Sequence, residues 1–477
     1  MRKIYFIDLF CGAGGVTSGI HRARYKEQQF AKVIACVNHD PLAIESHEAN
    51  HPDCIHYVEK IQVLDLAELK VIVKKLRRQD PDCLIFIWAS IECTNFSKAK
   101  GGLPRDADSR TLAEHLFRYE EELYLDGWFI ENVEEFMAWG PLDGNGKPIS
   151  KRNGEDYIRW VNKMQSYGYN FDYRILNAAD FGAYTSRRRY FAQFMRPGLS
   201  ITWPEATHSK KPSHTGMFGQ LDKWRAVKEV LDLTDEGKSI FDRKKPLSEK
   251  TLERIYAGLL KYVANGDDMF IAKHFSGRPK GKVIPVDGPA GTVTTFNGQS
   301  LVNVSFIAKY YSNGGQLNTI EEPASTLPTK DRLSLVTPTF LLNPAWGGYS
   351  TSIDQPSPVI IARGDKAPIY LVQADGGVFA GQISFMKFPS PPHSYNVLSN
   401  TKITIFMIKH GIVDIKMRML KIPELLRIQG FGDDYHLKGS QADQKKFIGN
   451  AVEVNQAKVI IEASYAGIMG LTERKTA

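Results

Sequence analysis

The sequence predicts an α/β fold with a mostly parallel sheet, followed by a smaller β-rich segment and a helical C-terminal segment. Over residues 1–195, short apolar runs alternate with stretches of helical periodicity. An internal repeat then occupies about 270–372, and helical periodicity returns after residue 417. We therefore expect a first domain at 1–195, a second domain at 196–417 and a further segment at 418–477.

The first domain contains six runs with the composition of buried strands. They are short and rich in β-branched or aromatic residues: Ile4–Phe10, Val33–Val37, Leu84–Ala89, Trp128–Val133, Arg174–Asn177 and Tyr190–Phe194. Helical patterns lie between them, at Pro41–Asn50, Leu112–Tyr124 and Glu155–Tyr167. This alternation predicts a sheet covered by helices on both faces. Ligands of such sheets bind beyond the carboxyl ends of the strands, so the residues that follow each strand are the candidates for a site.

The second domain carries a threefold repeat whose units start at Phe270, Phe306 and Phe340, 36 and 34 residues apart. Each unit continues with an acidic residue two positions before a proline, then a β-rich run, and closes on Leu-Val at 301–302, 335–336 or 371–372. This spacing predicts repeated β units in one domain. Hairpins stacked for stability and ligand recognition by each repeat both fit the pattern. The last segment shows helical periodicity at Ile422–Gln429 and Asn455–Met469.

Composition excludes several classes of protein. With 477 residues, 43% hydrophobic and 24% charged, the chain is neither disordered nor fibrous. Its net charge of +8 permits a polyanionic partner, and no apolar stretch is long enough for a membrane span. The N-terminal apolar run is interrupted by Asp8, unlike a signal peptide, so we expect a cytoplasmic protein. The five cysteines all precede residue 94 and contain no C-x-x-C pair, so we expect neither a disulfide framework nor a structural zinc.

Residues that could take part in chemistry lie at the ends of four of the predicted strands. A glycine-rich turn, with Gly12, Gly14 and Gly15, follows the first strand and lets a cofactor approach the backbone. Cys93 follows the most apolar strand, where nearby lysines or a helix N-terminus can activate a thiol. Glu131 ends the next strand, and three arginines, 187–189, precede the last. Taken singly, Cys93 is better explained as a buried structural cysteine and the arginines as a solvated basic edge.

Five motifs in chain order resemble those of the DNA cytosine-5 methyltransferase family. They cover nearly the whole chain: Asp8-Leu9-Phe10-Cys11-Gly12-Ala13-Gly14-Gly15, Glu131-Asn132-Val133, Arg187-x-Arg189, Arg418-x-Leu420 with Glu424–Phe431, and Gly449-Asn450-Ala451-Val452. The resemblance implies a Rossmann-like, S-adenosylmethionine-dependent methyltransferase domain at 1–195. It implies a target-recognition domain at 196–417, and a C-terminal segment, 418–477, that returns to the catalytic domain.

The resemblance also implies roles for individual residues. Cys93 is the nucleophile that adds to carbon 6 of a flipped-out cytosine, while Glu131, Arg187 and Arg189 hold the base. The expected residues of the methyl-donor site are Phe10, Gly12, Gly14, Gly15, Asn38, Asp40, Asn450 and Val452. The cofactor is S-adenosylmethionine, without a metal. The expected partner is double-stranded DNA, bound by a monomer, with a cognate restriction endonuclease that acts separately.

The chain departs from the family pattern at several positions. Ile91-Glu92 replaces the Pro-Pro that usually precedes the nucleophile, and Tyr184-Thr185 replaces Pro-Gln before the arginines. Asn38 occupies the position of the ribose-binding acid, with Asp40 two residues later, and Lys60-Ile61 replaces the adenine-contacting Asp-Ile. The base-handling residues are thus largely kept and the adenosine end of the donor site is altered. A different methyl donor, an RNA substrate or a catalytically silent DNA-binding protein are the alternatives.

Overall fold

The computed structural model describes residues 1–91, 112–141, 154–211, 221–261, 263–265, 269–273, 278–295, 299–305, 402–407, 412 and 414–476, with short strands between 308 and 372. The chain divides into two compact units. One contains Met1–Val230, Asp287–Asn297 and Lys421–Ala477, and the other contains Leu231–Val286 and Gly298–Leu420. Residues 196–230 and 287–297, which the sequence assigned to the second domain, therefore lie in the first unit.

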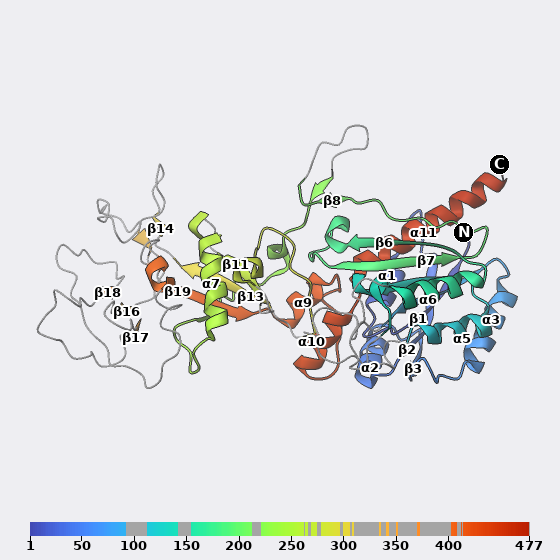
Figure 1. Ribbon diagram of the computed structural model, residues 1–477, viewed down its shortest axis with the longest axis horizontal. Coiled ribbons are helices and arrows are strands. Elements are labelled where there is room, and N and C mark those ends of the chain that lie inside the picture. The colour runs from blue at the N-terminus through green and yellow to red at the C-terminus, as the bar shows by residue number, and fades with distance from the viewer. Residues whose placement is uncertain are drawn as a thin grey trace, which may run out of the picture. The chain divides into compact units, whose positions relative to one another are not determined.

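The first unit is built on a seven-stranded sheet with the order β3-β2-β1-β4-β5-β7-β6 (Figure 1). Its strands are β1 (Ile4–Leu9), β2 (Ala31–Asn38), β3 (Ile55–Val58), β4 (Leu84–Ser90), β5 (Gly127–Asn132), β6 (Asn170–Asn177) and β7 (Arg188–Met195). The first five strands are paired in parallel, and β7 runs antiparallel to both β5 and β6. The prediction of an α/β fold with a mostly parallel sheet is confirmed.

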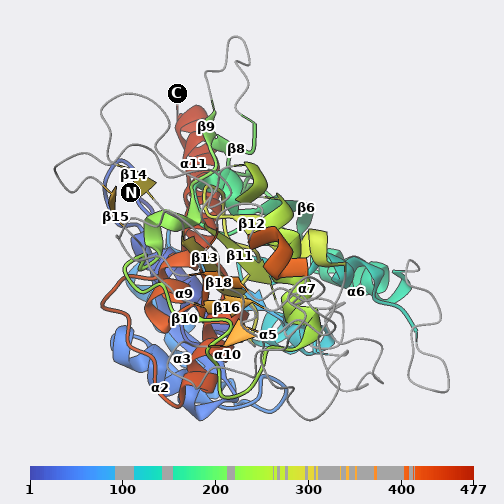
Figure 2. The same ribbon diagram turned by 90° about the vertical axis from the view of Figure 1, so that its left-hand side faces the viewer.

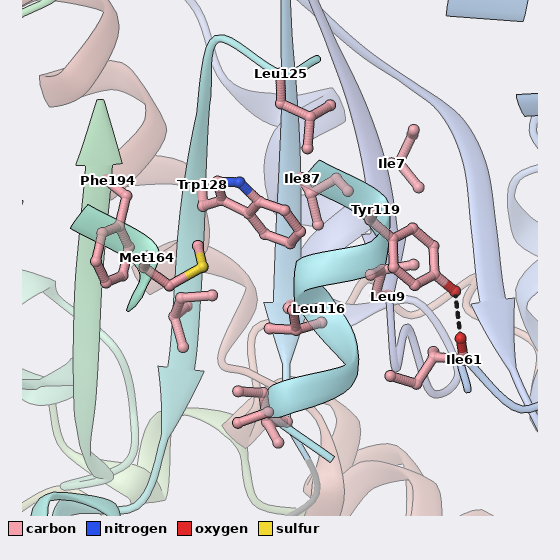
Figure 3. Packing of buried hydrophobic residues seen from close by; sticks show 14 of the residues in the cluster. Ile7, Leu9, Ile61, Ile87, Leu116, Tyr119, Leu125, Trp128, Met164 and Phe194 are labelled. Carbon is pink, nitrogen blue, oxygen red and sulfur yellow. Dashed lines mark hydrogen bonds between the residues drawn. The ribbon is translucent and has the colours of Figure 1, made fainter. Parts of the chain in front are cut away.

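Apolar residues on both faces of the strands hold helices on both sides of this sheet. Along β1, Ile7 and Leu9 join one hydrophobic cluster, while Phe6 joins the other. The first cluster packs under α3 (Ala67–Gln79), α5 (Phe117–Leu123) and α6 (Glu155–Ser166). Figure 3 shows Tyr119 of α5 in this cluster, where its hydroxyl donates to the Ile61 carbonyl over 2.9 Å.

The second cluster packs under α1 (Gly15–Arg22), α2 (Pro41–Asn50) and α11 (Val454–Thr476). The long C-terminal helix α11 lies against α1 and contributes Ala457, Ile460, Ile461, Tyr465 and Ile468 to this cluster. Its Tyr465 stacks on Phe30, with ring centroids 3.9 Å apart, and its hydroxyl donates to the Arg2 carbonyl over 2.7 Å. The C-terminal segment thus completes the core that the first strands begin, which is why both ends of the chain belong to one unit.

The second unit is centred on a five-stranded sheet in which every pairing is antiparallel, with the order β10-β19-β13-β11-β12 (Figure 2). Its strands are β10 (Lys238–Ser239), β11 (Met269–Lys273), β12 (Val283–Pro285), β13 (Gln299–Ser305) and β19 (Asp414–Met419). Helix α7 (Glu249–Lys261) packs on this sheet, where its Leu252, Ile255 and Leu259 share a cluster with Phe270 and Val302.

The three repeats share one strand register. In the first repeat Phe270 pairs with Val302 and Ala272 with Ser300, and in the third Phe340 pairs with Val372. In the second repeat Ala308 pairs with Ser334, two residues after the opening Phe and two before the closing Val of that unit. The short strands involved are β14 (Ala308–Lys309), β15 (Leu333–Ser334), β16 (Phe340–Leu342), β17 (Ser350–Thr351) and β18 (Tyr370–Val372). Each repeat therefore pairs its opening strand with its closing strand.

Several shorter elements complete the first unit. They are η2 (Glu114–Leu116), η3 (Glu134–Ala138), η4 (Ala178–Phe181), β8 (His208–Ser209), β9 (Asp222–Lys223), η6 (Val227–Val230), α9 (Ile422–Ile428) and α10 (Gln441–Asn450). Segments η7 (Val263–Asn265) and η8 (Pro279–Lys282) belong to the second unit. Among the described residues, no helix is long and apolar enough to cross a membrane.

Candidate functional site

Of the predicted base-handling residues, Glu131 lies near the carboxyl end of β5, beside that of β4. These strands are parallel neighbours, with Ser90 paired to Glu131. Strand β4 is buried along its length, and the description of the chain after it stops at Ile91, so Cys93 lies outside the described residues. Chain connectivity alone puts Cys93 three residues after the end of β4.

Glu131 is a buried carboxyl that faces an arginine. It is 5% exposed, and the Nε of Arg189 lies 3.2 Å from its Oε1. Burial raises the pKa of the Glu131 carboxyl above its ordinary value, against the opposing effect of the Arg189 and Arg187 guanidiniums. A raised pKa increases the protonated fraction of a carboxyl at a given pH, and the protonated form can donate to a ring nitrogen.

The three consecutive arginines face different ways. Arg188 is exposed and bonds to Glu134 over 2.9 Å. Arg187 is buried, and its Nη1 donates to the Gly449 carbonyl over 3.1 Å and its Nη2 to the Asn450 carbonyl over 3.5 Å. Because alternate residues of an extended chain point to the same side, Arg187 and Arg189 share the face that carries Glu131. The structure thus brings together Glu131, Arg187, Arg189 and the backbone of the Gly449-Asn450 motif.

A segment that the sequence assigned to the second domain supports this arginine motif. Ala290 donates its backbone N–H to the Tyr184 carbonyl over 2.7 Å, and Ser186 donates to the Ala290 carbonyl over 2.9 Å. The same segment passes so close to Gly449 that an added Cβ there would lie 2.3 Å from the Thr294 carbonyl carbon. The only signal in the sequence was the Asp287-Gly288-Pro289 turn, which we grouped with the repeats.

The glycine-rich turn after β1 has an open side and a packed side. Phe10 and Gly12 have positive φ values of 59° and 53°, and nothing lies within 4 Å of the position that a Gly12 Cβ would occupy. In contrast, a Cβ on Gly14 would lie 2.5 Å from the Tyr435 hydroxyl, and one on Gly15 would lie 2.6 Å from the Val452 carbonyl oxygen. Gly14 and Gly15 therefore permit close packing against the C-terminal segment, and the turn is open at Gly12.

Asn38 and Asp40 lie between β2 and α2 and already have partners. The Asn38 Oδ1 accepts from the Asp40 backbone N–H over 2.9 Å, and Asp40 caps α2 by accepting from the Leu42 N–H over 3.1 Å. The Nζ of Lys446 lies 2.7 Å from the Asp40 Oδ2. Asp40 is therefore a helix cap with an ion-pair partner, and the Asn38 Nδ2 is the group of this pair that can donate to a ligand.

The two remaining predicted donor residues differ in exposure. Asn450 ends α10 with an exposed side chain, and Val452 is buried against the N-terminal turn of α1. Helix α1 has no side-chain capping bond at Gly14. Its first-turn amides and the open side of Gly12 are chemically suited to the carboxylate and main chain of an amino-acid-derived ligand such as S-adenosylmethionine. The residues present therefore fit the methionine end of that cofactor.

Comparison with known proteins identifies a family. The sequence pattern of the C-5 cytosine-specific DNA methylases matches residues 4–466. Type II methyltransferase M.AgeI of Thalassovita gelatinovora is 24% identical over 94% of this chain and 95% of its own length. M.NgoBV of Neisseria gonorrhoeae is 22% identical over 97% and 99%. M.XorII of Xanthomonas oryzae is 30% identical over 42% of this chain, and this chain spans only 43% of that relative.

Proposed function

The chain belongs to the C-5 cytosine-specific DNA methylases, and we propose that it methylates carbon 5 of a cytosine within a specific DNA sequence. The observation that carries this proposal is the buried arrangement of Glu131, Arg189 and Arg187 beside the backbone of Gly449. It combines a carboxyl whose pKa is raised by burial with fixed cationic donors. That combination suits a neutral heterocycle that gains negative charge during the reaction.

In the proposed mechanism, the Cys93 thiolate adds to carbon 6 of the cytosine ring, and the new S–C bond places electron density on carbon 5. The Glu131 carboxyl donates its proton to N3, so that the ring does not accumulate a full negative charge. S-adenosylmethionine, when bound, supplies an electrophilic methyl group. Removal of the carbon 5 proton by a base, return of the N3 proton to Glu131 and departure of Cys93 as a thiolate then restore the aromatic ring and the starting state of the site.

Arg187 and Arg189 have different roles in the proposed site. Arg189 lies beside Glu131 and holds the carboxyl in position, and its charge stabilises electron density on the base oxygen. Arg187 is tied to the Gly449 and Asn450 carbonyls, so it fixes the C-terminal motif against the site. Gly12, the α1 amides and Asn38 would hold the methyl donor, while Asp40 shapes the pocket as the cap of α2.

The remaining expectations belong to this proposal. The cytosine must leave the duplex to reach a buried carboxyl, which costs a few kcal/mol that contacts in the pocket offset. The second unit would recognise the DNA sequence, with its basic residues on phosphates and base edges. We propose a monomer that works in the cytoplasm on double-stranded DNA, alongside a separate endonuclease of the same specificity.

The test is base-resolution mapping of cytosine methylation in plasmid DNA from cells that express the chain. We expect methylation at one short sequence, abolished by Cys93→Ala and reduced by roughly 10²–10⁴-fold in rate by Glu131→Gln. Arg189→Ala is expected to reduce it strongly. Arg188→Ala is the matched control, because this neighbouring arginine is exposed and faces Glu134.

The alternatives give different results. A folded protein that binds DNA but leaves every cytosine unmodified would overturn the proposal in favour of a silent binder. Methylated transfer RNA with unmodified plasmid would indicate an RNA substrate. A mass other than that of a methyl group on the nucleoside would indicate another donor.

A further inference from the structure

Five thiol and imidazole groups, none of which takes part in the proposed chemistry, meet around β2, α2, β3 and the turn after β1. Cys36 belongs to β2 and His47 to α2, while Cys54 immediately precedes β3 and His56 lies on it. Cys36, Cys54 and His56 each offer a ligand atom within 4.8 Å of the other two, and so do Cys11, Cys36 and His47. This is a compact set of sulfur and nitrogen donors.

Two separations in this cluster are near those of a tetrahedral metal site. The Cys36 Sγ lies 3.6 Å from the His47 Nδ1, and the His47 Nδ1 lies 2.9 Å from the His56 Nε2. Around Zn²⁺, with bonds of about 2.3 Å to sulfur and 2.0 Å to nitrogen, ligand atoms are roughly 3.3–3.8 Å apart. The sulfur–nitrogen pair already has this spacing, and the two imidazoles must separate by only about half an ångström.

A hydrogen-bond chain through Thr17 and Asp8 fixes the tautomer of His47, so that its unprotonated Nδ1 faces the cluster. The Thr17 hydroxyl donates to the Asp8 Oδ2 over 2.9 Å, which uses its single proton. The His47 Nε2, 2.9 Å from the Thr17 oxygen, must therefore be the donor of that bond. The lone pair is then on Nδ1, which faces Cys36 and His56. An oxygen that fixes the tautomer of a ligand histidine is the usual outer contact of a protein metal site.

We infer that Cys36, His47, Cys54 and His56 bind one Zn²⁺ as a structural site. Two thiolates and two neutral imidazoles give a Cys₂His₂ set, which zinc prefers, and the two thiolates balance the charge of the ion in a buried location. Cys36, His47 and Cys54 are buried, whereas His56 is half-buried and leaves a path for the ion. Cys11, whose Sγ lies 3.5 Å from the Gly12 carbonyl, remains outside the set.

Such a site would clamp α2 and β3 onto β2, next to Asn38 and Asp40. Four protein ligands leave no open position, so the metal would have no part in catalysis. The sequence-based expectation of no structural zinc depended on C-x-x-C spacing. Here the four ligands lie on three elements, at positions 36, 47, 54 and 56, and only the fold brings them together. This inference does not depend on the proposed methylation.

The test is the metal content of the tag-free full-length protein, expressed with added zinc and freed of unbound metal. We expect about one Zn²⁺ per chain in the wild type and its loss in Cys54→Ser and His56→Ala. The matched control is Cys83→Ser, which removes another buried free cysteine and should keep the ion. With Co²⁺ in place of zinc, we expect a sulfur-to-cobalt charge-transfer band that Cys54→Ser weakens.

Circular dichroism establishes that each variant is folded, and His56, being half-buried, offers the variant least disruptive to the core. Wild-type protein that retains no zinc after exposure to an excess would overturn the inference. A full equivalent of zinc retained in both Cys54→Ser and His56→Ala would overturn it equally, because the ion would then be bound elsewhere.

Discussion

The close approach of the 287–297 segment to α10 yields a sharp prediction at Gly449. Gly449 lies inside α10 and has no positive φ, so nothing in its own backbone requires glycine. Its surroundings do, because an added Cβ would lie 2.3 Å from the Thr294 carbonyl carbon and 2.4 Å from the Thr295 nitrogen. Both are backbone atoms, which cannot turn away as a side chain could.

Two opposing effects determine how much Gly449→Ala changes the free energy of unfolding. Alanine in a helix interior is favoured over glycine by about 1 kcal/mol. Overpacking against fixed backbone costs about 1–3 kcal/mol, and contacts this short with several backbone atoms argue for the upper end of that range. We therefore expect a net loss of about 2 kcal/mol, which for a unit of about 300 residues is a fall of roughly 3 °C in Tm.

The 287–297 segment, which the added Cβ would displace, also supports the arginine motif through the bond from Ala290 to Tyr184. Gly449 itself accepts a hydrogen bond from Arg187. We expect faster hydrogen exchange in residues 287–295 of Gly449→Ala and a lower rate of methylation. The control is Gly470→Ala in α11, where nothing lies within 4 Å of an added Cβ, so that stability should stay level or rise. If Gly449→Ala matches Gly470→Ala in Tm and exchange, the packing argument is wrong.

Two further predictions concern buried carboxyls. Glu120 is buried and pairs with the half-buried Arg196 guanidinium, and its Oε2 accepts from the Trp128 Nε1 over 3.1 Å, so Glu120→Gln should cost about 3 kcal/mol in thermal unfolding. Glu121→Gln, on the exposed side of the same helix, should cost little, and equal effects would refute this account. Burial raises the pKa of Glu453 from 4.5 to about 7. Because the folded state holds this proton more tightly, its stabilising contribution is complete below pH 4.5 and is lost, by up to about 3 kcal/mol, as the pH rises to 7. Glu453→Gln should therefore flatten the fall in stability over this interval, and an unchanged slope from urea unfolding at several pH values would contradict the assignment.

The strongly hydrophobic strand β4 was predictable from the sequence, and the weakly buried edge strand β3 was not. Strand β4 is apolar along Leu84–Ala89 because both of its faces are covered, and the sequence alone identified it. Strand β3, at Ile55–Val58, was missed, because this edge strand has exposed or half-buried residues throughout and no alternation. Strand β3 forms because it pairs with β2, and the local sequence of residues 55–58 does not reveal this pairing.

The candidate site also has features that the sequence predicted and features that only the structure shows. The sequence placed Glu131 at the end of a strand and the arginines before another, and the structure brings Glu131 to 3.2 Å from Arg189. It could not show that Asp40 is occupied as the cap of α2 and the partner of Lys446, since Lys446 is distant in the chain. Cys93 stays a prediction from motif and connectivity.

The common register of the repeats bears on what the second unit recognises. Ala272 pairs with Ser300 in the first repeat as Ala308 pairs with Ser334 in the second. The opening and closing strands of these repeats therefore form the same paired arrangement. The first repeat differs in where its turn goes, because Asp287–Asn297 belongs to the first unit and bonds to Tyr184 and Ser186. Its turn therefore supports the arginines, whereas its strands belong to the second unit. Substitutions in the 287–297 turn should accordingly change the rate of methylation at the same DNA sequence, and a change in sequence preference is expected only from residues of the second unit.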